Sequence, residues 1–360
     1  MKRVLILLAL VFTAMLVFTS CNEKYKPVES TEEESRVVYT MTIDGVKYEV
    51  KYELYRMLFL NNKELVDGGD DSVWSSDKKD EYVVRINKII YDRAAEIFSV
   101  FAFARQLDIN PYSVAVEDKI YEYIVLSVEG NQSDVQGHGS YEKFLASLKE
   151  KNMNYSVMEL LLRYSIVSSY VYEKYRGVTD EVLGELPGDI EISRDDVLAY
   201  YLGDDCARVL QMVSNDYDKM LQHKEKIKEK GDDDLAIALY MINNSTAVHT
   251  DLIVDKKSSG VVIGRYALDS NVFGEYADTV FALKNGELSD VVKVDGEGCY
   301  IAYKLQKTEE HFDRCYDVIR QSYIDNAVGR RLEEIKSSLI CSMQLDKNHS
   351  SIDHAAISMG

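Results

Sequence analysis

Apolar side chains recur at helical spacing over a long stretch of the N-terminal half, and this pattern constrains the fold most. The apolar positions share one face of a helix with 3.6 residues per turn, which predicts an amphipathic helix over about 82–106. Only 3 prolines occur in the 360 residues, so few positions interrupt a helix. The residues of the apolar face are Val83, Ile86, Ile90, Ala94, Ile97 and Phe101.

The rest of the N-terminal half predicts a hairpin followed by further helices. "VYTMTIDGVKYEV" alternates apolar and polar residues on both sides of Asp44-Gly45, which is a hairpin signal. A helix is expected from near Val50, and "DGGDDSVWSSDKKDE" is expected to be a loop because of its glycines and charges. Ser193 is a candidate N-cap for a short helix. The other expected helices cover about 114–128, 140–151 and 155–176.

The pattern changes after this short helix. Residues of about 204–307 predict a compact unit with the order βααβαββ, which ends in a hairpin across Asp295-Gly296. A long helix with one apolar face, from Phe312 to Leu339, is expected to follow. The tail from Cys341 has no periodicity and is expected to be disordered.

The first residues indicate export. Lys2 and Arg3 precede an apolar run that ends at Phe18, which is typical of a secretory signal and short for a membrane span. "FTSC" resembles a bacterial lipobox, in which Cys21 would be lipidated, although Phe18 replaces the usual Leu. The alternative is an ordinary signal peptide with a chance cysteine. The polar stretch "NEKYKPVESTEEES" then predicts a flexible tether.

Charge and motif content exclude several classes of function. The formal net charge of −19 disfavours nucleic acid as a partner, because an acidic protein repels phosphate. The cysteines after Cys21 have no CxxC spacing and the histidines no metal-ligand spacing, so no metal and no cofactor are expected. No calcium-loop, GxSxG or Walker pattern occurs. The four later cysteines are Cys206, Cys299, Cys315 and Cys341.

Part of the βααβαββ unit carries a recognisable motif. Phe281-Ala282-Leu283 followed by Gly286-Glu287-Leu288-Ser289 resembles the "FALxxGExS" motif of the parvulin family of peptidyl-prolyl isomerases. The flanking segments "ARQLDIN", "FLASLKEKNM" and "SRDDVLAYY" resemble exported foldases of the PrsA and SurA type. In that family a parvulin domain is inserted into a helical chaperone domain, and a lipidated cysteine is typical of the PrsA-like kind.

The resemblance implies an α+β fold divided as follows: a signal peptide (1–20), a lipidated tether (21–36), an N-terminal helical chaperone domain (37–203), the inserted parvulin-like domain (204–307), a C-terminal helix packing on the N-terminal domain (308–340) and the disordered tail (341–360). The protein would then be extracytoplasmic and anchored through Cys21 to the bacterial cell membrane.

Parvulins act through a polar network of two histidines and a Cys or Asp, and this chain departs from that pattern. Arg208 in "ARVL" and Tyr300 in "GCYIA" stand at the expected histidine positions, and Val262 stands near the Cys or Asp position. Arg208 could instead be a solvated edge-strand residue. Tyr300 could be plain core or a hydrogen-bond donor to a bound carbonyl. His249 could supply a replacement imidazole or be merely solvated.

The apolar cup for the proline ring is better preserved. Val272 stands where a Met is common, Tyr276 stands where a Phe is common, and Phe281 belongs to the motif itself. The resemblance thus implies a membrane-anchored foldase for unfolded or partly folded exported polypeptides, a parvulin-type isomerase with a degenerate active site. The alternative is a non-enzymatic holdase chaperone. A structural or solute-binding lipoprotein is a third class, which the resemblance disfavours.

Overall fold

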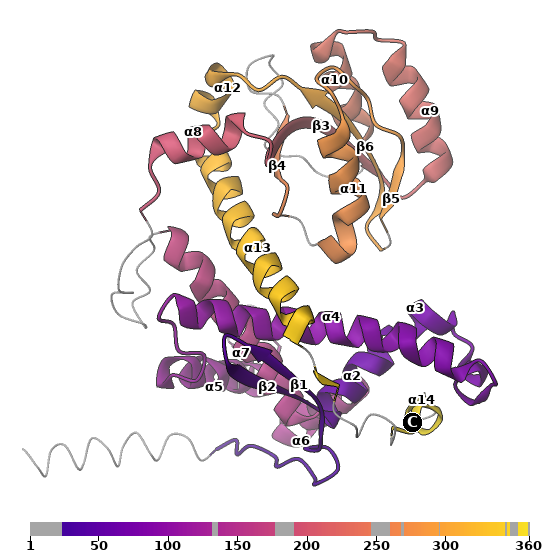
Figure 1. Ribbon diagram of the computed structural model, residues 1–360, viewed down its shortest axis with the longest axis vertical. Helices are drawn as coiled ribbons and strands as arrows, with labels where there is room; N and C mark the ends of the chain where they lie inside the picture. The colour runs from indigo at the N-terminus through magenta and orange to yellow at the C-terminus, as the bar shows by residue number, and fades with distance from the viewer. Residues whose placement is uncertain are drawn as a thin grey trace, which may run out of the picture. The chain divides into compact units, whose positions relative to one another are not determined.

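The computed structural model describes residues 24–131, 136–176, 191–245, 260–267, 270–294, 296–342, 344–345 and 352–358. The signal peptide, Cys21 and His249 lie outside these residues. The chain forms two compact units (Figure 1). The first comprises Met1–Val171, Thr179–Glu185 and Ile335–Gly360, and the second comprises Tyr172–Val178 and Leu186–Glu334. The α+β class expected from the sequence is confirmed.

The first unit contains a small antiparallel sheet with the strand order β2-β1-β7. The expected hairpin consists of β1 (Val37–Ile43) and β2 (Val46–Lys51). Asp44 and Gly45 both have positive φ, 48° and 76°, as the tight two-residue turn between twisted strands requires. The third strand, β7 (Gln344–Leu345), pairs with the β1 residues Tyr39 and Thr40.

The helices of the first unit follow the periodicity of the sequence closely. The long amphipathic helix α4 buries Ile86, Ile90 and Phe101 completely, because these residues share its apolar face. The described α-helices of residues 52–176 belong wholly or partly to this unit. They are α2 (Tyr52–Asn62), α3 (Glu64–Asp67), α4 (Lys79–Gln106), α5 (Val114–Glu129), α6 (Tyr141–Glu150) and α7 (Tyr155–Arg176), which runs past the boundary of the unit.

The segment before α4, which was expected to be a loop, contains a 3₁₀ helix, η2 (Asp71–Ser75). Its Trp74 is completely buried, and the indole Nε1 donates a hydrogen bond of 2.8 Å to Asp67. The Asp70 carboxylate caps the helix by accepting from the backbone N–H of Ser72. The glycines and charges around Trp74 suggested a solvated loop. The segment is ordered instead, because burial of the apolar indole is favourable.

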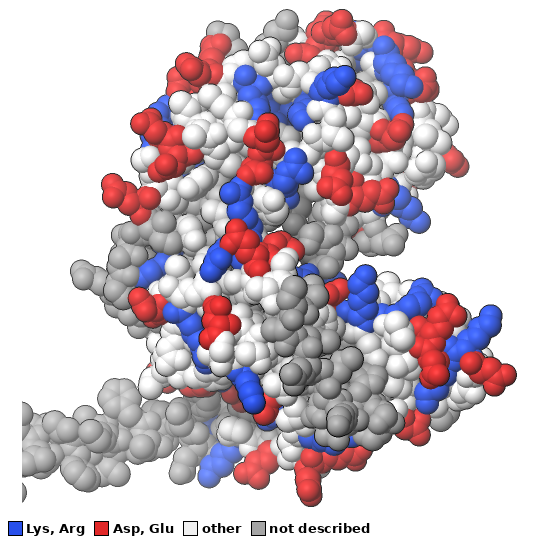
Figure 2. Space-filling model, viewed as in Figure 1, with Lys and Arg blue, Asp and Glu red and all other residues white. Residues whose placement is uncertain are grey.

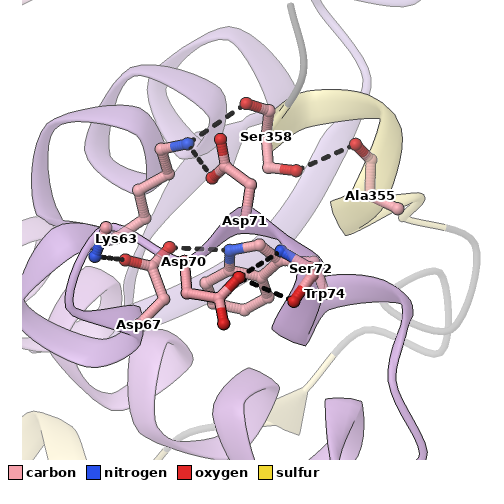
Figure 3. A network of polar contacts seen from close by, with 9 residues as sticks. Lys63, Asp67, Asp70, Asp71, Ser72, Trp74, Ala355 and Ser358 are labelled. Atoms are coloured by element: carbon pink, nitrogen blue, oxygen red, sulfur yellow. Dashed lines mark hydrogen bonds and ion pairs between the residues drawn. The ribbon is translucent and has the colours of Figure 1, made fainter.

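The tail expected to be disordered also has structure, and this expectation is corrected for residues 352–358. A short helix, α14 (His354–Ser358), packs against η2 and α2 (Figure 3). His354 stacks on Trp74 with ring centroids 6.2 Å apart, and its Nε2 is 2.8 Å from the hydroxyl of Tyr55. Lys63 donates to the carbonyl of Ser358 and pairs with Asp71. The sequence of residues 352–358 has no periodicity, and long-range contacts order this segment.

The second unit has the expected element order βααβαββ. Its sheet is antiparallel with the strand order β4-β3-β6-β5. Two helices, α9 and α10, bury their apolar residues on one face of the sheet, and α11 covers the other face. The elements are β3 (Cys206–Ser214), α9 (Tyr217–Lys228), α10 (Asp234–Asn244), β4 (Val261–Gly264), α11 (Ser270–Ala282), β5 (Val292–Val294) and β6 (Gly298–Leu305).

Three helices outside the expected boundaries of this unit also contribute to it. They are α8 (Arg194–Leu202), α12 (Glu309–Arg314) and α13 (Tyr316–Ser342) up to Glu334. The capping box of Ser193 and Asp196 begins α8 as the sequence predicts. The chain leaves helical conformation at Cys315, which divides the expected single C-terminal helix into α12 and α13. Close contact of α13 with Tyr266 requires Gly329, where a Cβ would lie 1.8 Å from the Tyr266 carbonyl oxygen.

The two units differ from the domain boundaries expected from the sequence. The helix α8 was expected in the N-terminal domain, and it belongs to the second unit. The C-terminal helix was expected to pack on the N-terminal domain, and its residues belong to the first unit only from Ile335. None of the described helices is long and apolar enough to cross a membrane.

Candidate functional site

The candidate site lies on the sheet face that α11 covers. The ring of Tyr300, on β6, lies 4.9 Å from the ring of Tyr276 and 5.8 Å from that of Phe273, both on α11. Tyr276 is 1% exposed, so it belongs to the core of this face. The remaining buried members of the cluster are aliphatic: Ala207, Val209, Val213, Ile263, Val280, Val292, Val294 and Ala302.

A polar side chain on this face, that of Gln211, was not among the site residues expected from the sequence. Gln211 lies on β3, and its Oε1 accepts a hydrogen bond of 2.9 Å from the Tyr276 hydroxyl. Residues 209–213 of this strand read "VLQMV", so the lone polar residue within these five was the available signal. Satisfying a buried tyrosine hydroxyl is a sufficient reason for a glutamine at this position.

Arg208 and Tyr300 are not brought together. The register pairs Arg208 with Leu305 and Val213 with Tyr300, so the two residues are five positions apart along the ladder. An odd separation places their side chains on opposite faces of the sheet. The β3 residues on either side of Arg208, Ala207 and Val209, belong to the face of Tyr300. Arg208 and Tyr300 therefore cannot contact one ligand on a single face of the sheet.

The surroundings of Arg208 are those of a structural residue. It is 4% exposed, which rules out the alternative of a solvated edge-strand side chain, and its Nη1 donates to the carbonyl of Gln306 at 2.9 Å. Burial lowers the pKa of its guanidinium from the ordinary value. Nearby, His311 is completely buried, with Nδ1 3.0 Å from the Tyr201 hydroxyl. Burial and the positive charge of Arg208 lower the pKa of His311 to about 4.

The other expected site residues occupy varied positions. Val262 pairs with Arg208 and packs away from the Tyr276–Tyr300 cluster, so two of the three expected network positions lie opposite the third. Phe281 packs on the cluster, but the Arg265 guanidinium lies 4.2 Å above its ring. Val272 belongs to α11, and its side chain lies outside the described part of the chain.

The tyrosine hydroxyls on this face can bind but do not ionise near neutral pH. Burial raises the pKa of Tyr276, and burial together with the charge of Glu297 raises that of Tyr300. Lys304, further along β6, is bound to the end of α11, with its Nζ 2.8 Å from the Leu283 carbonyl. Among the described residues no cluster of side chains could hold a metal ion. The chemistry available is apolar contact and neutral hydrogen bonding.

Comparison with known proteins finds similarity to foldase structures. No family model matches the chain, and no curated protein matches it. The foldase protein PrsA from Streptococcus pneumoniae is 15% identical, with 76% of this chain and 93% of that chain covered and a TM-score of 0.31. PrsA from Bacillus subtilis is 17% identical, with 75% and 91% covered and a TM-score of 0.24. The peptidylprolyl isomerase PrsA from Bacillus anthracis is 13% identical, with 69% and 96% covered and a TM-score of 0.28. With TM-scores of this size the similarity carries no argument about the site.

Proposed function

We propose that this chain is an extracytoplasmic foldase that binds segments of exported proteins. Its second unit would keep the parvulin arrangement while lacking the polar network that catalyses prolyl isomerisation. The proposal rests on the motif "FALxxGExS" at 281–289 and on the βααβαββ order of the unit that contains it. Lipidation of Cys21 would hold the foldase at the bacterial cell membrane, where exported chains emerge.

The composition of the face under α11 supports the proposal that the polar network for isomerisation is missing. The polar side chains beside the hydrophobic cluster of this face are Gln211, whose Oε1 already accepts from the Tyr276 hydroxyl, and Lys304, whose Nζ is bound to the end of α11. Isomerisation must lower a rotation barrier of about 18–20 kcal/mol, which requires polar groups that weaken amide resonance. Tyr300 has a hydroxyl with no hydrogen bond to another described residue, so it is available on this face as a neutral donor to a bound carbonyl.

Exchange NMR on proline tetrapeptides separates isomerase from holdase. The protein would be the soluble form from Asn22 onward, compared with Tyr300→Phe, and each would also be tested for suppression of client aggregation. We expect suppression of aggregation without acceleration of exchange. Acceleration that is lost in Tyr300→Phe would instead assign catalysis to this hydroxyl. If the wild-type protein neither accelerates exchange nor suppresses client aggregation, the foldase proposal is overturned.

The anchor can be tested separately. Cys21→Ser should move the full-length protein from the membrane fraction to the soluble extracytoplasmic fraction, because the lipid chains supply the apolar transfer energy that holds it. Retention of Cys21→Ser in the membrane fraction would contradict lipid anchoring.

A further inference from the structure

The hairpin of the first unit has one strand edge with no described partner. The sheet order β2-β1-β7 leaves β2 at its margin. The two-residue turn makes Ile43 and Val46 a hydrogen-bonded pair, and bonded pairs then alternate along the ladder through Tyr48. The backbone N–H and C=O groups of Lys47 and Glu49 consequently point away from β1. Such an edge can accept a further strand.

A cavity of about 530 Å³ lies beside this edge, within the first unit. Lys47, Tyr48 and Glu49 line one side, and residues of α4, α5 and α7 line the rest. Tyr48 is 4% exposed, and its hydroxyl has no hydrogen-bond partner among the described residues. This hydroxyl is therefore available to hydrogen-bond a ligand group that enters the cavity. Phe98 packs 5.1 Å from the Tyr48 ring and gives the cavity an apolar wall.

Of two arginines that line the cavity, Arg163 is paired with carboxylates and Arg105 is not. Arg163 is saturated: it makes two hydrogen bonds to Glu117, of 2.7 and 3.0 Å, and one of 2.6 Å to Glu159. Arg105, at the end of α4, is exposed and lies 5.7 Å above the ring of Tyr48. No carboxylate of the described residues pairs with Arg105. In a chain of net charge −19, this side of the cavity presents an unsatisfied cation.

Strand geometry relates the edge to the cation. Side chains that stand opposite each other in a ladder share one face of the sheet. A strand added to β2 would place the residue opposite Tyr48 on the Tyr48 side, toward Arg105 and Phe98. An aspartate or glutamate there would meet the guanidinium, and apolar residues two positions away would meet the aromatic wall.

We propose that the edge of β2 and its cavity bind an extended client segment by strand addition, with an acidic side chain paired to Arg105. This inference rests on the proposed foldase function and names the client class at this site: extended segments in which an acidic residue has apolar residues two positions before and after it. Backbone pairing supplies affinity without demanding a sequence, and Arg105 supplies the preference for acidic segments.

Fluorescence anisotropy with labelled peptides tests the site on the soluble chain from Asn22 onward. The probe is an extended peptide with one glutamate, valines two positions before and after it, and threonines at the intervening positions; its controls are the same peptide with lysine in place of the glutamate and a version with alternate backbone N-methyl groups. Arg105→Gln is compared with Arg85→Gln, because Arg85 is also exposed on α4 and also stacks on a tyrosine, Tyr82, at 5.8 Å. Hydrogen exchange of the Lys47 and Glu49 amides is followed in parallel.

We expect Arg105→Gln and N-methylation each to weaken binding of the acidic peptide at least tenfold, and Arg85→Gln to leave it unchanged. The amides of Lys47 and Glu49 should become protected when the peptide binds. Equal binding by Arg105→Gln and Arg85→Gln, or binding without protection of these amides, would overturn the inference. Peptide binding by a protein that fails to suppress client aggregation would support this site while rejecting the foldase function.

Discussion

Buried polar residues of the second unit are paired with neutral partners. Tyr276 donates to Gln211, and Tyr201 is joined to His311. A neutral pair avoids the large free energy that a desolvated charge would cost. The arrangement leaves these two pairs uncharged near neutral pH, and it makes the buried histidine sensitive to acid.

Acid should destabilise the second unit through His311. The pKa of His311 is lowered to about 4 in the folded chain, against about 6.5 in the unfolded chain, so the unfolded state binds the proton first. The free energy of unfolding should therefore fall as the pH drops from about 6.5 to about 4, by up to about 3 kcal/mol. Urea unfolding at a series of pH values, followed by circular dichroism, measures the loss.

The control for this prediction is His311→Gln, which keeps a polar side chain and removes the titration. Its free energy of unfolding should vary less steeply with pH over the same window, while the carboxylates titrate alike in both proteins. An equal pH dependence in the two proteins would show that another group controls the acid response.

At the scale of elements, η2 and α14 support each other. The buried ring of Trp74 is covered by His354, and Ile352 and Ile357 are 6% and 4% exposed. Neither element is long enough to be stable alone, since isolated helices need more residues than these contain. Their order depends on contact between segments nearly 300 positions apart in the sequence.

Deleting residues 346–360 should uncover Trp74. The deletion removes the burial of two isoleucines, and it also removes the entropy cost of ordering the segment. From the difference we expect the free energy of unfolding of the first unit to fall by about 2 kcal/mol. Trp74 is the chain's single tryptophan, so its emission should shift to longer wavelength and acrylamide should quench it more strongly. Ser358→Ala, which removes only a hydroxyl bonded to Ala355, is the matched control. Unchanged emission in the truncated protein would contradict the packing of α14.

At the scale of the whole molecule, acidic side chains outnumber basic ones, 61 to 42. Figure 2 shows the two kinds interspersed over the face in view. A net charge of −19 produces a field that is felt over about a Debye length, roughly 10 Å at 0.1 M salt. Clients therefore meet a mean negative field before they meet any particular site.

Away from the local contact at Arg105, basic clients should accordingly be held better than acidic ones at low salt. Light scattering of a basic and an acidic unfolded client of matched length, at about 50 mM and about 500 mM salt, measures the effect. We expect suppression of the basic client's aggregation to weaken several-fold at high salt. A preference that ignores both client charge and salt would exclude the field as a cause. Arg105→Gln should leave this mean preference unchanged, because it alters one local contact.

Local patterns in the sequence predicted much of the fold. The helical spacing of apolar residues predicted α4 and α5 almost to the residue, the Asp44-Gly45 pair predicted the hairpin, and Ser193 predicted a helix start. Each is a short-range property, because a helical face or a turn is specified by residues that are neighbours in the chain. The motif at 281–289 likewise lies within one continuous segment.

The tertiary structure decided the features that depend on distant residues. Strand register placed Arg208 and Tyr300 on opposite faces, a difference that a shift of one residue reverses and that the sequence pattern does not encode. Contacts across the chain ordered η2 and α14 around Trp74 and brought the β2 edge beside Arg105. The sequence by itself predicted most of the elements and their order, and it leads us to expect an export signal before Cys21. Which side chains meet was decided only by packing, because burial and pairing are free energies of the assembled core.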